Sequence, residues 1–439
     1  MSILKPLKHR KPSGSAALVL LSGLTLLVAL PVGWRFLQTS EVNAYAYPFS
    51  LSSKNPDRGT LEQTISFYQG RVQQNPEDGL DRATLASAYL KMARATGDDS
   101  WYLLAEESAQ QSLANLPFDN DGAVLALARV AEAKHDFAEA IRLAEQASGE
   151  EALAVLVTSK LALGDVKEAD AVANTLVDLS PSLGSFTLRA LTRSTQGDRD
   201  GALSDFQQAI AAEEPAETRG SAWVRTLLGR FYVQQGKHDL ANQLYREALE
   251  IVPDYPLALL HRAELKTRLG HYRAAERDYS KVSDPIALQG IARVKSLRGN
   301  ANNDLWDKAE TALRQQIDEN ALGHRRDLAH LLLERGNPED VPEAIALLQA
   351  EANQRRDART LDLLAWALSQ AGRWQEAQQI IREALDQGIQ EAGIFYRAGE
   401  IETALNNSNQ ADQYFRLAQD TDPTFDQQAR QRLGLVAHP

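Results

Sequence analysis

The chain has 439 residues and a formal net charge of −12, and 44% of its residues are hydrophobic, 7% aromatic and 24% charged. Its first forty residues hold five Lys or Arg and no acid, so the remainder carries −17, and a phosphate backbone would be repelled by a body this acidic. The absence of cysteine excludes structural disulfides, thiolate metal sites and a cysteine nucleophile.

The amino-terminal segment predicts a membrane anchor. Residues 1–15 are basic, and residues 16–37 contain an uncharged run up to Trp34 that is about long enough to cross a hydrocarbon core of roughly 30 Å as a helix. The basic tail predicts a cytoplasmic N-terminus and a body on the periplasmic side. Two alternatives remain, a buried soluble helix and a signal peptide cleaved after Ala46, which would release a soluble periplasmic protein.

Residues 38–59 show no helical period and are predicted to be a linker. The chain then becomes a series of helical hairpins, and the clearest lies at 221–255. Its first segment places Leu227 and Phe231 on one face, Gly236 interrupts it, and the second segment repeats apolar pairs until Pro253. One such hairpin has too little core to be stable alone, so it needs neighbours of its own kind.

Similar units recur along the rest of the chain. After an opening helix at 60–76, units are predicted at 83–117, 122–148, 150–181, 183–215, 221–255, 256–289, about 290–318, 325–353, 360–389 and 392–425. Residues 426–439 are predicted to form a capping helix and tail that cover the end of the stack. Within a unit, the recurring positions are a small residue eighth, Gly near the fifteenth, Ala twentieth, an aromatic twenty-fourth, Ala twenty-seventh and Pro thirty-second.

This pattern resembles the tetratricopeptide repeat family over residues 60–425. The resemblance implies an all-α fold, a right-handed α-solenoid of helical hairpins preceded here by one transmembrane helix. It also implies a protein or peptide partner held in a concave groove lined by the first helix of each unit. The chain departs from the family where the fourth-position Trp is missing from most units and where insertions occur near 300 and 340.

The resemblance also implies which residues face the groove. In this family the second, fifth, ninth, twelfth and thirteenth positions of a unit point into the groove. This positional rule, carried over to the present chain, names residues that include Trp223, Arg230, Glu264, Arg268, Trp366 and Tyr396. We expect Arg230 and Arg268 to form a positive island beside Trp223 that suits an acidic side chain or terminus. Family members that clamp chaperone carboxyl termini use paired Lys and Asn at the fifth and ninth positions of a unit. The unit counted from Ala222 has Thr226 and Arg230 there, so that ligand is not expected.

No motif for catalysis accompanies the repeats. Metalloprotease, nucleophile-elbow, phosphate-loop and dinucleotide-binding patterns are missing from the sequence, and the eight histidines are scattered. We therefore expect no catalytic residue, cofactor or metal, and a membrane-anchored extracytoplasmic scaffold that binds proteins or peptides, in the assembly of an envelope complex. The alternatives are a cleaved, soluble periplasmic binding protein and an accessory subunit of an envelope enzyme.

Overall fold

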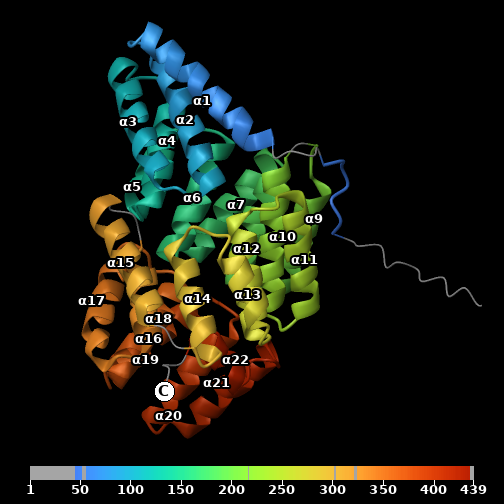
Figure 1. Cartoon of the computed structure of the whole chain (residues 1–439), viewed down its shortest axis with the longest axis vertical. Helices are drawn as coiled ribbons and strands as arrows, with labels where there is room; N and C mark the ends of the chain where they lie inside the picture. The colour runs from blue at the N-terminus through green and yellow to red at the C-terminus, as the bar shows by residue number, and fades with distance from the viewer. Residues whose placement is uncertain (1–44, 52–55, 216, 301–302, 321–323, 436–439) are drawn as a thin grey trace, which may run out of the picture. The chain divides into compact units, whose positions relative to one another are not determined.

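The computed structural model describes residues 45–51, 56–215, 217–300, 303–320 and 324–435, and all regular structure in these ranges is helical (Figure 1). The first eleven helices are α1 (Pro56–Gln74), α2 (Gly79–Thr96), α3 (Ser100–Asn115), α4 (Asp121–Ala133), α5 (Phe137–Ala144), α6 (Glu150–Leu163), α7 (Val166–Leu179), α8 (Leu183–Thr195), α9 (Arg199–Ala211), α10 (Thr218–Val233) and α11 (His238–Ile251). The others are α12 (Pro256–Arg268), α13 (Tyr272–Tyr279), α14 (Pro285–Leu297), α15 (Asn303–Asn320), α16 (Arg325–Arg335), the short 3₁₀ helix η1 (Pro338–Asp340), α17 (Val341–Ala352), α18 (Ala358–Gln370), α19 (Trp374–Asp386), α20 (Ala392–Ala404), α21 (Ser408–Thr421) and α22 (Gln427–Arg432).

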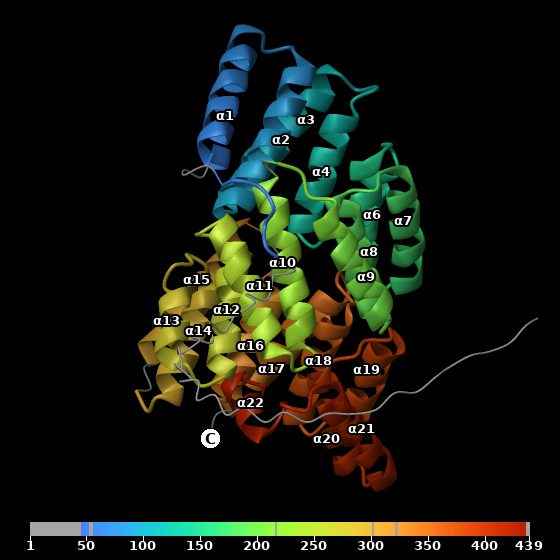
Figure 2. The same cartoon turned by 90° about the vertical axis from the view of Figure 1, so that its right-hand side faces the viewer.

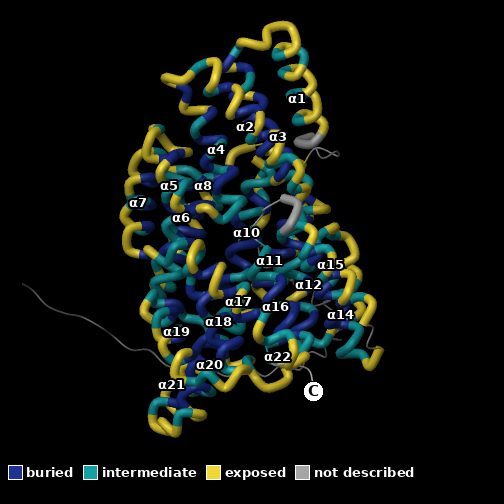
Figure 3. The backbone as a smooth tube through the Cα atoms, turned by 90° about the vertical axis from the view of Figure 1, so that its left-hand side faces the viewer, coloured by how far each residue is buried: buried dark blue, intermediate teal, exposed yellow. Residues whose placement is uncertain are grey.

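Helices α2 to α21 pack as consecutive antiparallel hairpins, each made of an even-numbered helix and the odd-numbered helix that follows it. Most of the even-numbered helices also contact the next even-numbered helix, so they form a continuous layer, which we call the inner wall. Buried positions run through both layers, whereas α1 is exposed along much of its length (Figure 3). The described residues therefore form a repeat solenoid, in which each unit obtains its core from its neighbours.

The hairpins are held close by small residues opposite aromatic rings. Gly229 of α10 faces Tyr245 of α11 so closely that a Cβ at this glycine would lie 2.5 Å from the ring. Gly399 of α20 faces Phe415 of α21 in the same way. These are the eighth and twenty-fourth positions of their units, so the sequence period reflects the close crossing of two helices.

The sixth hairpin, α12 with α13, ends earlier than its predicted unit of 256–289. Helix α13 ends at Tyr279 and α14 begins at Pro285, so Gln289 belongs to the following hairpin. The Asp284 side chain accepts a hydrogen bond of 2.8 Å from the Ile286 N–H, and proline at the first helical position needs no hydrogen-bond acceptor. This cap sets the start of α14 and shifts the unit expected at about 290–318.

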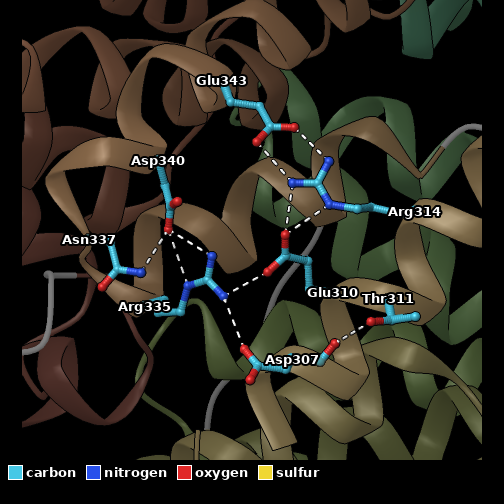
Figure 4. A network of polar contacts seen from close by, with 8 residues as sticks. All are labelled: Asp307, Glu310, Thr311, Arg314, Arg335, Asn337, Asp340 and Glu343. Carbon is cyan, nitrogen blue, oxygen red and sulfur yellow. Dashed lines mark hydrogen bonds and ion pairs between the residues drawn. The ribbon is translucent and has the colours of Figure 1, made fainter. Parts of the chain in front are cut away.

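A network of ion pairs joins α15, α16 and α17, where the repeat pattern in the sequence is weakest (Figure 4). Arg335 donates to Glu310 at 2.7 Å and to Asp340 at 2.8 Å, and Arg314 donates to Glu343 at 2.6 Å. Burial raises the pKa of Glu310, but hydrogen bonds from Arg314 and Arg335 outweigh it and lower that pKa overall. Charged pairs thus add to the packing of Ala309 and Ala344, the small residues that remain buried in these units.

Turns of the early hairpins rest on loops and helix ends about two hundred positions later in the chain, along a line that we call the seam. The Arg356 N–H donates to the Ala162 carbonyl at 2.8 Å, and His135 Nδ1 lies 2.7 Å from Glu351 Oε1. Gly197, at φ 80°, approaches Gly388 so closely that a Cβ would lie 2.8 Å from its carbonyl oxygen. Figure 2 shows this arrangement, with α8 and α9 above α18 and α19. The seam therefore joins two successive turns of the solenoid.

His324 adds a titratable contact to the seam, and its effect on stability should depend on pH. Burial disfavours its protonation, but hydrogen bonds to Asp327 and to Asp99, each 3.4 Å long, raise its pKa to about 10. Because this value exceeds the roughly 6.5 of an unfolded histidine, the stabilisation is complete below about pH 6.5 and is lost as the pH rises to about 10. We expect His324→Gln to lower the melting temperature at pH 6 and to have little effect near pH 10, with the exposed His271→Gln as control. An equal loss of stability at both pH values would contradict this prediction.

Helix α22 does more than cover the last hairpin, because it packs against α12 and α14 of the inner wall. Arg432 donates to the Arg268 carbonyl at 3.0 Å and to the Tyr272 hydroxyl at 3.2 Å. The segment before α22 places Thr424 within 2.9 Å of the Arg268 guanidinium. The C-terminal segment thus folds back across the inner wall in the second half of the solenoid.

Residues 45–51 belong to the predicted linker, yet they pack on the solenoid. The Tyr45 carbonyl accepts from Arg225 Nε at 2.8 Å, and the Tyr45 and Tyr232 hydroxyls are 2.8 Å apart. The Tyr47 N–H donates to Glu247 at 2.8 Å. Within the described ranges, no helix combines the length and the apolar character needed to span a bilayer, and the predicted anchor at 16–37 and tail at 1–15 lie outside those ranges.

Candidate binding surface

A cavity of about 800 Å³ opens on the inner wall of the first half of the solenoid, and we call it the inner-wall cavity. Its lining comes from even-numbered helices α2 to α12, together with α1 and Tyr255, which precedes α12. The lining residues are Thr60, Leu61, Lys91, Arg94, Arg129, Ala154, Thr158, Gly184, Leu188, Arg219, Gly220, Trp223, Tyr255 and Leu257. Its volume falls within the roughly 300–1,000 Å³ typical of ligand sites.

The charge of this lining is opposite to that of the chain as a whole. Four of its residues are Lys or Arg and none is Asp, Glu, Asn or Gln, whereas the chain has 59 acids and 47 Lys or Arg. Lys91 and Arg94 are exposed and form no hydrogen bond or ion pair with another described residue. Arg129 pairs with Glu132 at 2.8 Å and lies 3.8 Å from Glu151. The cavity therefore presents more positive charge than its surroundings neutralise.

The Lys and Arg residues of the lining lie near one another on the inner wall, although they come from different helices. Arg219, at the start of α10, donates to the Ala95 carbonyl near the end of α2 at 3.1 Å, which brings together helices 124 positions apart. The surrounding protein lowers the pKa of Arg94, and the positive charge of Arg129 lowers it further. Lys91 lies one helical turn before Arg94 on the same face. One part of the cavity is thus a compact cationic cluster.

Trp223, one of the residues predicted to face the groove, contributes an aromatic wall to the inner-wall cavity. It is half-buried, packing on a cluster that includes Leu188 and Leu176 while it lines the cavity. Tyr255 and Leu257 follow on the next hairpin. Trp223 is therefore both part of the core and accessible from the inner wall.

Arg230 and Glu264 lie apart from this cavity, in a polar cluster formed with the later helix α18. The positive charge of Arg359 and burial lower the pKa of Arg230 to about 10. Glu264 is exposed and lies 3.2 Å from His261, and Arg359 binds Glu391 at 2.8 Å. Arg230 thus faces another arginine that already has a carboxylate partner.

Arg268 and Trp366 are not exposed groove residues, so the expected positive island beside Trp223 does not form. Arg268 is 6% exposed and pairs with the buried Asp422 of the C-terminal segment. Trp366 is 2% exposed, with the Arg397 guanidinium 4.9 Å from its ring centroid. The substitution Arg268→Glu would bring two buried carboxylates together, so it would test folding rather than binding.

Tyr396 lines a second cavity, of about 520 Å³, together with Trp366. The Arg430 guanidinium stacks 3.8 Å from the Tyr396 ring centroid, and Phe425 lies 6.2 Å away. Leu435 also lines this cavity. The second predicted contact region is therefore partly covered by the chain's own C-terminal segment.

The sequence prediction missed Lys91, Arg94, Arg129 and Arg219. Lys91 and Arg94 occupy the ninth and twelfth positions of the unit that begins at 83, so the positional rule used for later units would have named them. Arg219 precedes the periodic part of its unit and carries no such signal. Across the described ranges, no group of three or more His, Asp or Glu side chains is placed to hold a metal ion.

Comparison with known proteins identifies the class. Tetratricopeptide repeat models match residues 184–254, 360–392 and 392–425, which agrees with the hairpins at these positions. The chain is therefore a tetratricopeptide repeat protein.

Two relatives share a descriptive name. A stretch of 222 residues is 27% identical to the Cellulose synthase operon protein C of Pseudomonas fluorescens (strain SBW25), covering 45% of this chain and 16% of that protein. A stretch of 282 residues is 29% identical to the protein of the same name from Xanthomonas axonopodis pv. citri (strain 306), covering 62% of this chain and 18% of that protein. The chain thus spans less than a fifth of the length of either relative.

A similar solved structure is the crystal structure of the APC/C hetero-tetramer Cut9-Hcn1, at a TM-score of 0.38 and 11% identity. The alignment covers 86% of this chain and 93% of that one.

Proposed function

We propose that this protein is a non-catalytic scaffold that holds a protein partner in the inner-wall cavity. The observation that carries the proposal is the cavity of about 800 Å³ on the inner wall, which combines the aromatic Trp223 with exposed cations. Aromatic side chains and arginine are the residue types that most often dominate binding energy at protein interfaces. The inner wall of the second half is partly covered by α22, so the first half offers the more open surface.

We further propose that residues 16–37 anchor the scaffold in a membrane, with the N-terminus in the cytoplasm and the repeats on the periplasmic side. The support is the uncharged run before Trp34 behind a basic tail. A reporter that is active only outside the cytoplasm, fused after Pro439, tests the orientation, and an inactive reporter would contradict it. An accessory role beside a polysaccharide-synthesising enzyme is a second candidate, favoured by the printed name of the two relatives.

Site-specific photocrosslinking in the native host should locate the partner. A photoreactive residue at Lys91, which lines the cavity, should yield a discrete crosslinked species, whereas the same residue at exposed Arg246 of α11 should not. Trp223→Ala should weaken this crosslink several-fold, because it removes the aromatic anchor.

The melting temperature of the Trp223→Ala protein must be measured alongside, since Trp223 is half-buried. Equal crosslinking from positions 91 and 246, or an unchanged yield in a folded Trp223→Ala protein, would exclude the cavity as the binding site.

A further inference from the structure

The residues that line the inner-wall cavity also indicate the chemistry of its ligand. We infer that it takes an acidic segment of a partner protein in which two or more Asp or Glu side chains stand next to an apolar side chain. This inference rests on the proposed function and specifies the partner's binding segment. It commits to side-chain carboxylates within a peptide rather than to a chain terminus or a glycan.

The first argument is charge. Lys91, Arg94, Arg129 and Arg219 line the cavity with no acidic residue among its lining, in a chain of net charge −12. Arg129 is paired with Glu132, which leaves the exposed pair Lys91 and Arg94 to face the cavity without an ion-pair partner among the described residues. Gathered like charges are unfavourable unless counter-charges are supplied, and carboxylates of a ligand would add to the partial neutralisation that Glu132 and Glu151 provide.

The second argument is the number of charges. A free carboxyl terminus brings one negative charge, whereas two neighbouring Asp or Glu side chains bring one for each of the two cations without an ion-pair partner among the described residues, Lys91 and Arg94. Arg219 contacts Ala95 of α2, which brings it to the end of the helix that carries Lys91 and Arg94. Guanidinium groups bind carboxylates through paired, charge-assisted hydrogen bonds.

The third argument is the remainder of the lining. Trp223, Tyr255 and Leu257 form an aromatic and aliphatic wall next to the cations, together with Leu61 and Leu188. This wall suits an apolar side chain beside the acids. The lining contains no carboxylate or amide side chain to accept hydrogen bonds from sugar hydroxyl groups, which favours a peptide over a carbohydrate.

The test starts from an unbiased probe, a phage-displayed library of random dodecapeptides selected on the purified full-length protein. We expect the enriched peptides to carry net negative charge, with paired Asp or Glu beside an aromatic or aliphatic residue. The variant Lys91→Glu with Arg94→Glu should lose this enrichment. Its matched control is Lys167→Glu with Arg246→Glu, which makes the same charge change at exposed positions of α7 and α11 and should retain the enrichment.

Affinity measurements on the best peptide then define the chemistry. Replacing its acids by Asn and Gln, or using the Lys91→Glu and Arg94→Glu variant, should weaken binding at least about tenfold, whereas amidating its C-terminus should have little effect. Higher salt should also weaken binding.

The inference would be overturned if the enriched peptides were neutral or basic, or if the library enriched no sequence over the double variant. It would also be overturned if peptide binding required a free carboxyl terminus. An oligomer of uronic acids that binds the cavity when acidic peptides do not would overturn it as well. If crosslinking from position 91 persists while acidic peptides show no preference, the scaffold function stands and only the ligand chemistry is wrong.

Discussion

Replacing Glu334 by alanine is expected to lower the free energy of unfolding by about 3–5 kcal/mol. Glu334 lies in α16 and is fully buried. It accepts hydrogen bonds of 2.7 Å from Arg293 and from Gln289, both in α14. Truncation would leave the buried Arg293 guanidinium without its counter-charge, and an uncompensated buried charge is among the costliest defects in a folded protein.

Urea denaturation followed by circular dichroism measures this loss. Because a repeat array need not unfold in one step, hydrogen exchange of the α14 and α16 amides should be recorded as well. The exposed Glu339→Ala is the matched control and should change stability by less than about 0.5 kcal/mol. The double variant Arg293→Met with Glu334→Leu should recover most of the loss, because apolar residues can replace a buried pair.

The pH dependence gives an independent check on Glu334. Burial raises its pKa, but the charge and hydrogen bonds of Arg293 outweigh burial and lower it overall. Its stabilisation is therefore present above the roughly 4.3 of an unfolded glutamate and is lost as the pH falls below that value. A Glu334→Ala protein as stable as the control near pH 7 would show that the pair contributes no net stability.

The substitution Arg225→Ala should have an effect of similar size, about 3–5 kcal/mol, and should also release residues 45–51. Arg225 is fully buried in α10, pairs with the buried Glu213, and donates to the Tyr45 carbonyl at 2.8 Å. Its guanidinium lies 5.9 Å from the Tyr47 ring centroid. Losing this side chain would leave Glu213 buried and unpaired and would remove two contacts that hold the amino-terminal segment.

Two measurements separate these consequences. Urea denaturation reports the loss of stability, and limited proteolysis or hydrogen exchange reports release of residues 45–51. Arg246→Ala, at an exposed position of α11, should change neither. If Arg225→Ala destabilises the protein while residues 45–51 stay protected, other contacts such as the one between Tyr47 and Glu247 hold the segment.

The hairpins could be predicted from the sequence because the contacts that form each of them lie within one unit. Gly229 and Tyr245 lie sixteen positions apart within one unit, and their contact leaves a repeating trace in the amino-acid pattern. The prediction was wrong about the boundary near 285, where a local signal, the aspartate cap before a proline, was not used. Around Glu310 and Arg335 the repeat pattern in the sequence is weak, but the hairpins persist and ion pairs join their helices.

The residues of the candidate site could be predicted from the sequence only in part. Trp223 lies on the inner wall as the positional rule proposed, and the same rule applied to the unit at 83 would have named Lys91 and Arg94. The rule failed for Trp366 because side chains of the adjacent hairpins, His330 of α16 and Arg397 of α20, pack against its ring. The rule failed for Arg268 because it describes one hairpin and its neighbours. It contains no information about α22, whose preceding segment covers Arg268.

The sequence by itself therefore determined the helical repeat and part of the inner wall, such as the place of Trp223. Only the tertiary structure decided which residues close the seam, such as Ala162 with Arg356, and where the C-terminal segment rests. The physical reason is that these contacts depend on the rotation accumulated over several hairpins. A small change in each packing angle moves the point where distant turns meet, and contacts made once in the chain leave no periodic pattern in the sequence.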